Sequence, residues 1–276
     1  MEEPSSLREK ILDWLTKQGY PLEMRVASLI RQQTELSVRQ GWHYSDPETT
    51  TSREIDVVCT HSEIYGLAAV HFAISCKSGN KPWVLFTSPH AMENYNRLLR
   101  FAITSRDARS VIADAVFLKS DANPSPRPPL TWFWDDGTTG YTIAQAFGEK
   151  TDIPFSATLS AVKAALYCCV SSPQHTSAPR FSVSFPVVVT SAPLFACSID
   201  EAGATQLSEI DMGFLFFQQK IRDLPSVRVA VVAEKGLDRY IEDCKAVISE
   251  LQGIFAPAVE TEWTEIKART GGAEPT

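Results

Sequence analysis

Two short segments that alternate in the manner of β-strands most constrain the fold of this chain. The first is Arg53-Glu-Ile-Asp-Val-Val-Cys59, and the second is His71-Phe-Ala-Ile-Ser-Cys-Lys77. Because successive side chains of a strand point to opposite faces, each segment has an apolar side and a side that ends in charge. A turn near Gly66 separates them, so the pattern predicts neighbouring strands.

Alternation also predicts which side chains lie together. Glu54 and Asp56 share one face of the first strand, and His71, Ser75 and Lys77 share one face of the second. An acid and a lysine at the ends of neighbouring strands can hold a divalent cation and a phosphate. These strand ends are therefore the first candidate for a chemical site.

Two helices are predicted before the strands. Apolar residues recur at helical spacing from Ser5 to Lys17, and a second helix begins at Pro21 and is expected to run to about Arg39. A polar connection over residues 42–52 then leads into the first strand. Glu23 lies in the first turn of the second helix, where the helix dipole alone favours a carboxylate.

The remainder of the chain alternates short strands with helices. A third strand is predicted over 82–87, and an insertion over about 88–152 contains a helix over 92–103 and a proline-rich loop over 121–129. Downstream we expect helices over 156–169 and 237–252, and strands over 181–189, 193–199 and 213–218 that form an antiparallel hairpin pair. A buried strand is expected over 227–233, and a polar tail over 261–276.

Composition sets outer limits on function. Of 276 residues, 44% are hydrophobic and 21% are charged, as in ordinary globular proteins. The net charge of −7 argues against a surface coated with basic groups for nucleic acid, but it leaves room for a local basic cleft. The six cysteines, mostly in apolar runs, favour reduced core thiols of a cytoplasmic protein. No apolar run approaches the roughly 20 residues of a membrane helix, so no membrane association is expected.

Several short motifs together resemble the PD-(D/E)XK, or restriction-endonuclease-like, nuclease superfamily. They are Gly19-Tyr-Pro-Leu-Glu23, Tyr44-Ser-Asp46, Arg53-Glu-Ile-Asp56, Ser75-Cys-Lys77 and Lys81-Pro-Trp83. The resemblance covers most of residues 19–87 and, more loosely, 156–199. It implies an α/β fold, as a single domain over 1–260, with a β-rich C-terminal extension. The implied core is a helix, three strands, a helix and a strand, here those of Glu23, Asp56, Lys77, Val84, Lys163 and Val187.

The resemblance also implies roles for particular residues. Lys77, Asp56 and Glu23 would be catalytic, with Lys77 positioning or activating a water and offsetting charge near the phosphate. Magnesium or manganese would be bound by Asp56, Glu23 and the main-chain carbonyl of Cys76. The residues expected beside the substrate are Ser75, His71 and Lys163.

One position departs from the family pattern. Ser75 stands where the family usually has Glu or Asp two residues before the lysine, and a neutral hydroxyl is a poor magnesium ligand. Either another carboxylate compensates, such as Glu54 on the strand of Asp56 or Glu63 in the turn, or metal affinity is too low for turnover. Glu54 has a structural alternative as well, namely a pair with Arg53 or a backbone amide.

Two classes of function follow from the sequence. The leading hypothesis is a magnesium-dependent DNA endonuclease of a defence or repair system, for which a homodimer is a reasonable form. The alternative is a catalytically impaired module of the same fold that binds nucleic acid or a protein partner.

Overall fold

The structure is a computed structural model of the chain, and it describes residues 6–16, 18–46, 48–91, 93, 101–118, 139–148, 152–170, 180–218, 221 and 226–270. In this part of the chain the α-helices are α1 (Leu7–Thr16), α2 (Tyr20–Gln33), α4 (Arg106–Ala113), α6 (Ile153–Val170) and α7 (Leu237–Thr270). A π-helical turn, Asp114–Leu118, continues α4. The apolar segment 111–118 is therefore helical.

The described strands form one mixed sheet. They are β1 (Ser37–Ser45), β2 (Ser52–Ser62), β3 (Ala68–Lys77), β4 (Trp83–Thr87), β5 (Ile103–Thr104), β6 (Thr139–Gln145), β7 (Phe181–Thr190), β8 (Leu194–Ile199), β9 (Thr205–Glu209), β10 (Met212–Phe217) and β11 (Val227–Ala233). Their order in the sheet is β1-β2-β3-β7-β11-β10-β6-β4-β8-β9, and β5 pairs with β7 off this path. The fold is thus mixed α/β, as predicted.

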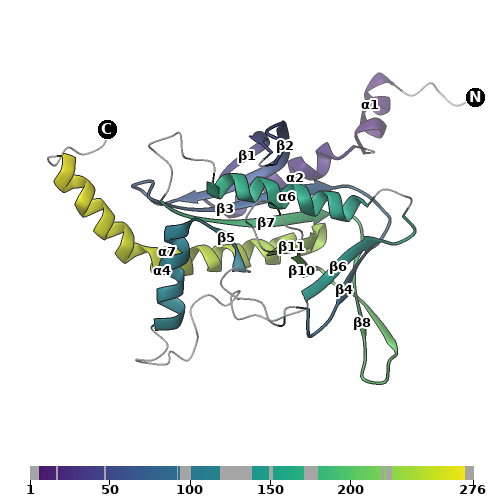
Figure 1. Ribbon diagram of the computed structural model, residues 1–276. Helices are drawn as coiled ribbons and strands as arrows, with labels where there is room; N and C mark the ends of the chain where they lie inside the picture. The colour runs from purple at the N-terminus through teal and green to yellow at the C-terminus, as the bar shows by residue number, and fades with distance from the viewer. Residues whose placement is uncertain are drawn as a thin grey trace, which may run out of the picture.

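Helices cover both faces of the sheet (Figure 1). One face packs against α2, α4 and α7 in a core to which β7 contributes Val187 and Val189. The other face packs against α6, with Val188 turned toward it. Every residue of β7 is buried, because the strand lies between β3 and β11 and parallel to both. A strand buried on two faces favours apolar side chains, and β7 has them at every position except Ser182, Ser184 and Thr190.

The strands around Asp56 differ from the prediction in two respects. The second helix ends at Gln33, where Thr34 turns to an extended conformation and its side chain bonds the carbonyl of Ile30. Residues 37–45, predicted as helix end and polar connection, form the edge strand β1, antiparallel to β2. The expected third core strand, β4, is not next to β3 but pairs with β6 and β8. The three adjacent strands are therefore β1, β2 and β3.

The C-terminal strands were predicted in place but not in pairing. β7 is parallel to β3 and β11, and the antiparallel pairs here are β8 with β9 and β10 with β11. The sequence did not suggest β9, because all five of its residues are exposed. The helix predicted over 237–252 continues as α7 to Thr270, where a polar tail was expected from 261. Residues 121–129 and most of 92–103 lie outside the described part.

Candidate active site

The candidate site lies in a fork between β2 and β3. β2 pairs with β1 from Ser52 to Thr60, but with β3 only from Val57 to Ser62. β3 continues beside β7 as far as Lys77, so the two strands separate beyond the pair Val57–Ile74. Asp56 is the first residue of β2 past the last pair, and its side chain enters the opening.

Asp56 is bound to the separating strand. Its Oδ2 accepts hydrogen bonds from the backbone N–H of Cys76 at 2.5 Å and from the hydroxyl of Ser75 at 3.3 Å. The ammonium of Lys77 lies 3.8 Å from the same oxygen. The side chains of Asp56 and Lys77 are 19% and 33% exposed, so an acid and a cation meet at the rim of the fork, open to solvent.

Strand alternation breaks at this point. Ile55 packs in the core under α6, whereas Val57, two residues on, packs in the core under α2 and α7. On β1, Gly41 stands opposite Asp56 with φ of +58°, a conformation that L side chains rarely adopt. Strict alternation would place Ile55 and Val57 on one face, but they lie in different cores because the strand twists where it leaves β3.

Glu23 is within electrostatic range of the pair. Its pKa is raised first by burial and then by repulsion from Asp56, with Lys77 lowering it and Glu54 raising it further. Glu23 lies in the first turn of α2, so the helix-dipole explanation of this carboxylate also holds. Arg53 pairs with Asp46 rather than with Glu54, whose carboxylate lies against Gly41. The structure therefore brings Glu23, Asp56 and Lys77 together, with Glu54 nearby.

The donor set only partly fits a divalent cation. Two neighbouring carboxylates supply negative charge, and their mutual repulsion favours a cation between them. Ser75 is 1% exposed and donates to Asp56, so its hydroxyl already has a partner. The thiol of Cys76 is buried, which raises its pKa well above the ordinary value. Among the described residues, no group of three or more His, Cys, Asp or Glu side chains is arranged to hold a metal ion.

A cleft of about 940 Å³ adjoins the fork. One wall comes from α1 and α2, and the other from residues 78–80 after β3 and from Ser191 after β7. Leu22 and Ser78, which line it, are the sequence neighbours of Glu23 and Lys77. The cation in the lining, Arg25, is paired with Glu234 at 2.5 Å. This cleft could not be predicted from the sequence, because its walls come from segments far apart in the chain.

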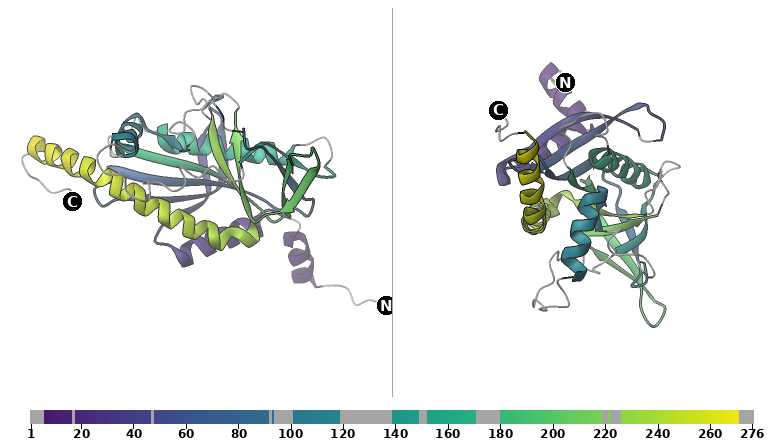
Figure 2. Two further views of the ribbon diagram at one scale, coloured as in Figure 1. Left: turned by 90° about the horizontal axis from the view of Figure 1, so that it is seen from below. Right: turned by 60° about the vertical axis from the view of Figure 1, so that its left-hand side comes forward.

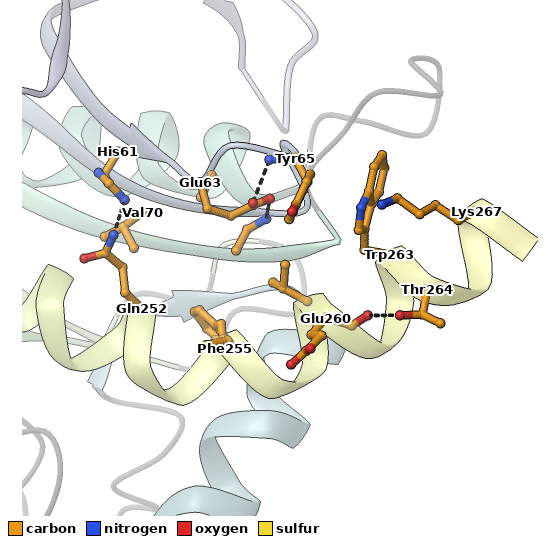
Figure 3. A pocket seen from close by; sticks show the side chains of 14 residues that line it. His61, Glu63, Tyr65, Val70, Gln252, Phe255, Glu260, Trp263, Thr264 and Lys267 are labelled. Atoms are coloured by element: carbon orange, nitrogen blue, oxygen red, sulfur yellow. Dashed lines mark hydrogen bonds between the residues drawn. The ribbon is translucent and has the colours of Figure 1, made fainter. Parts of the chain in front are cut away.

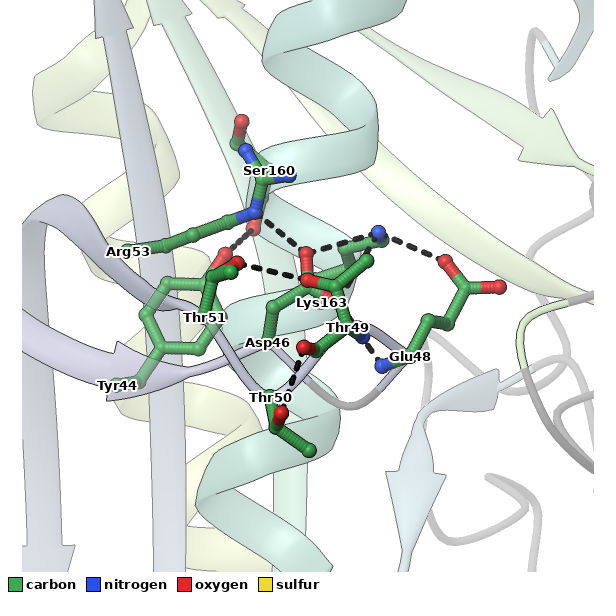
Figure 4. Close-up of polar contacts among 9 residues, drawn as sticks. All are labelled: Tyr44, Asp46, Glu48, Thr49, Thr50, Thr51, Arg53, Ser160 and Lys163. Carbon is green, nitrogen blue, oxygen red and sulfur yellow. Dashed lines mark hydrogen bonds and ion pairs between the residues drawn. The ribbon is translucent and has the colours of Figure 1, made fainter.

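Lys163, expected beside the substrate, belongs to a separate buried cluster (Figure 4). Its ammonium lies 3.0 Å from Asp46 and 2.7 Å from Glu48, and the side chain is 8% exposed. Burial alone would lower the pKa of Lys163, but the bonds to Glu48 and Asp46 outweigh it and raise the pKa. The charge of Lys163 is thus neutralised inside the protein.

Asp46 is the centre of this cluster. It accepts from the backbone N–H groups of Glu48 and Thr49 and from Arg53, in addition to Lys163. Burial raises the pKa of Asp46, yet these donors together hold it well below its usual range. The cluster fixes the end of β1 to α6 and to β2, which is the strand that carries Asp56.

His71 is also placed away from the candidate site. It pairs with Thr60 across β2 and β3, its Nδ1 3.0 Å from the Thr60 hydroxyl, and its buried Nε2 has no hydrogen-bond partner. Burial, and next the charge of Arg39, lower its pKa to about 4. Six residues along a strand separate His71 from Lys77, or about 20 Å. A direct role beside the phosphate is therefore excluded by distance.

A second cavity, of about 610 Å³, lies at the opposite end of β3 (Figure 3). It is enclosed by the β2–β3 turn and the C-terminal half of α7, where Tyr65 stacks on Trp263 with ring centroids 4.4 Å apart. Glu63, expected as a substitute ligand, instead accepts three backbone N–H groups of the turn. This cavity is about 20 Å or more from Lys77 along β3, too far for its lining to act together with Asp56 and Lys77.

Comparison of the chain with family models, with curated proteins and with solved structures finds no match. Over the residues that the structure describes, no helix has both the length and the apolar composition needed to cross a membrane. The fork is therefore the feature of the molecule from which a function can be inferred.

Proposed function

We propose that this protein is a metal-dependent DNA endonuclease, acting in the cytoplasm in defence or repair. The observation that carries the proposal is that the ammonium of Lys77 and the carboxylate of Asp56 lie 3.8 Å apart in the fork. Glu23 is close enough to both for their charges to shift its pKa. Phosphodiester hydrolysis requires an activated water and neutralisation of the charge that develops on the phosphate. An acid pair beside a lysine provides groups for both tasks.

The order of elements supports the same proposal. In chain order, α2, the antiparallel meander of β1, β2 and β3, then α6, and β7 parallel to β3 give a helix, three strands, a helix and a strand, with β4, β5, α4 and β6 inserted between β3 and α6. The resemblance to PD-(D/E)XK nucleases implies this order of element types, although it assigned the three strands to Asp56, Lys77 and Val84 rather than to β1, β2 and β3. The acid and the lysine come from the second and third strands of the meander.

Magnesium or manganese, when bound, would supply Lewis acidity to the attacking water and the phosphate. Asp56 and Glu23 would hold it, together with the main-chain carbonyl of Cys76. Lys77 orients a phosphate oxygen and offsets its charge. Burial and the neighbouring charge of Asp56 raise the pKa of Glu23, so this carboxylate binds a proton more readily than an exposed one.

A second function has one observation in its favour. Ser75 replaces an acidic ligand and is already bonded to Asp56, so the site has one negative charge fewer than the family pattern. With too little charge to retain the cation, the fold would bind nucleic acid or a protein partner without cutting. Binding that weakens with salt but no cleavage at any metal concentration would favour this alternative.

The deciding experiment is cleavage of supercoiled and linear DNA with magnesium or manganese. Lys77→Ala and Asp56→Ala are each expected to lose at least about a hundredfold in rate, as single catalytic groups commonly do. Lys245→Ala is the matched control, because this lysine is an exposed partner of Glu242 on α7. Cleavage that survives in both fork variants would refute the assignment of the site.

A further inference from the structure

Helix α1 exposes its apolar side to solvent. Leu7, Ile11 and Trp14 follow one another at helical spacing and are 74%, 47% and 52% exposed. Figure 2 shows α1 standing away from the rest of the protein in both views. Burial of these side chains is what stabilises an amphipathic helix of ten residues, since short helices are marginal in water on their own.

The exposed surface continues onto α2. Tyr20 and Met24, one turn apart, are 57% and 63% exposed, and Met24 lines the cleft together with Leu12 of α1. A large side chain has a surface on the order of 150–250 Å². Multiplied by the exposed fractions of six residues, this gives an exposed apolar area of roughly 650 Å² for Leu7, Ile11, Leu12, Trp14, Tyr20 and Met24. The largest apolar patch of a typical monomer is about 300–600 Å², and a standard interface buries about 800 Å² on each partner.

We propose that this surface, defined by Leu7, Ile11, Leu12, Trp14, Tyr20 and Met24, is the interface through which two copies of the chain form a dimer. A helix that presents one continuous apolar stripe is complementary to its own copy about a two-fold axis, which requires only one kind of patch. The area is close to what one partner contributes to a stable dimer.

Other occupants fit the surface less well. Nucleic acid binds through cations, and the arginine beside the patch, Arg25, is paired with Glu234. A helix lying on an anionic membrane carries an excess of Lys and Arg on its polar side. Helix α1 instead has no excess of basic residues, since Arg8 and Lys10 are balanced by Glu9 and Asp13.

The interface has a consequence for the proposed nuclease, and this part of the inference rests on that function. The cleft beside Glu23 and Lys77 is walled by α1 and α2, so dimerisation through these helices sets two forks at a fixed separation on one particle. Two forks held together can cut both strands of a duplex in one encounter. Two separate monomers would leave nicks.

The test is the solution mass of the full chain, measured by light scattering over micromolar concentrations. Wild type is expected near twice the 30.5 kDa of one chain. Ile11→Glu and Trp14→Glu place a charge in the interface and should raise the dissociation constant by at least about tenfold. Leu207→Glu on β9, where the leucine is 60% exposed, is the matched control and should leave the dimer intact.

Three results would overturn the dimer. They are a monomeric wild type, a dimer that persists in both α1 variants, and a monomer that sediments with anionic vesicles through α1. The measurement of solution mass does not depend on catalytic activity. A protein that is dimeric but inactive would therefore contradict the proposed nuclease function and leave the dimer proposal standing. If the protein is active, the α1 variants should shift products from linear to nicked plasmid while still cutting.

Discussion

Lys163→Met tests whether the buried cluster around Asp46 stabilises the fold. The substitution keeps a long apolar side chain under the sheet but removes the cation that lies 3.0 Å from Asp46. Asp46, whose side chain is 0% exposed, would then remain as a buried carboxylate bound to Arg53 and two backbone N–H groups. Removing one partner of a buried pair costs about 3–5 kcal/mol, and the remaining donors place this case near 3 kcal/mol.

The loss can be measured by thermal and urea unfolding. For a chain of this size, about 3 kcal/mol lowers Tm by roughly 6–12 °C. Lys245→Met is the control, because its pair with Glu242 is exposed and should change stability by no more than about 0.5 kcal/mol. In the double variant Asp46→Asn/Lys163→Met, the loss should be smaller than the sum by about 2 kcal/mol, since the two side chains are partners.

The cluster also predicts a pH dependence. The folded-state pKa of Asp46 is lowered, so its contribution is complete above the unfolded pKa of about 3.9 and is lost as the pH falls below that value. The stability difference between wild type and Lys163→Met should therefore shrink toward pH 3. A difference below about 1 kcal/mol at neutral pH, or additive losses in the double variant, would refute this account of Asp46.

Three further predictions follow from the fork, the strands and α7. Ser75→Asp places a second carboxylate against Asp56, so it should lower the free energy of unfolding when a chelator is present and should tighten manganese binding measured by calorimetry. A manganese affinity equal to that of wild type would contradict this prediction. His71 has its pKa lowered to about 4 by burial, so protonation favours the unfolded state; wild type should lose up to ~3 kcal/mol between pH 6.5 and 4, and His71→Phe should not show this loss. Trp263→Ala removes the stacking on Tyr65, worth about 1 kcal/mol, and should speed hydrogen exchange over residues 260–270; unchanged exchange would mean that α7 is held elsewhere.

The sequence was most informative where local pattern and local structure agree. β2 and β3 were predicted from their alternation, and the turn between them from Gly66, whose φ of +71° favours glycine. β1 was missed because it is an edge strand with mostly polar and exposed residues, so its stability comes from pairing with β2 rather than from its own pattern.

Long-range contacts explain the remaining differences. The end of α7 has a polar sequence, but Trp263 stacks on Tyr65, and the ion pairs of Arg180 with Asp107 and Glu262 link α7 to α4. The polar composition of residues 261–270 gave no indication of these partners. In the same way, Lys163 was predicted to lie beside the substrate because its ion-pair partner Asp46, 117 positions away in the chain, could not be recognised from the sequence.

Position 75 connects the fold of the fork to its chemistry. A carboxylate there would face Asp56 at hydrogen-bond distance, and two buried like charges require a cation or a proton between them. Ser75 donates a hydrogen bond instead, and the N–H of Cys76 donates a second to the same oxygen. Asp56 is thus held in place by the protein alone, so a cation would bind to a site that is already formed. Metal should accordingly raise the Tm of wild type less than that of Ser75→Asp, where it would also relieve repulsion.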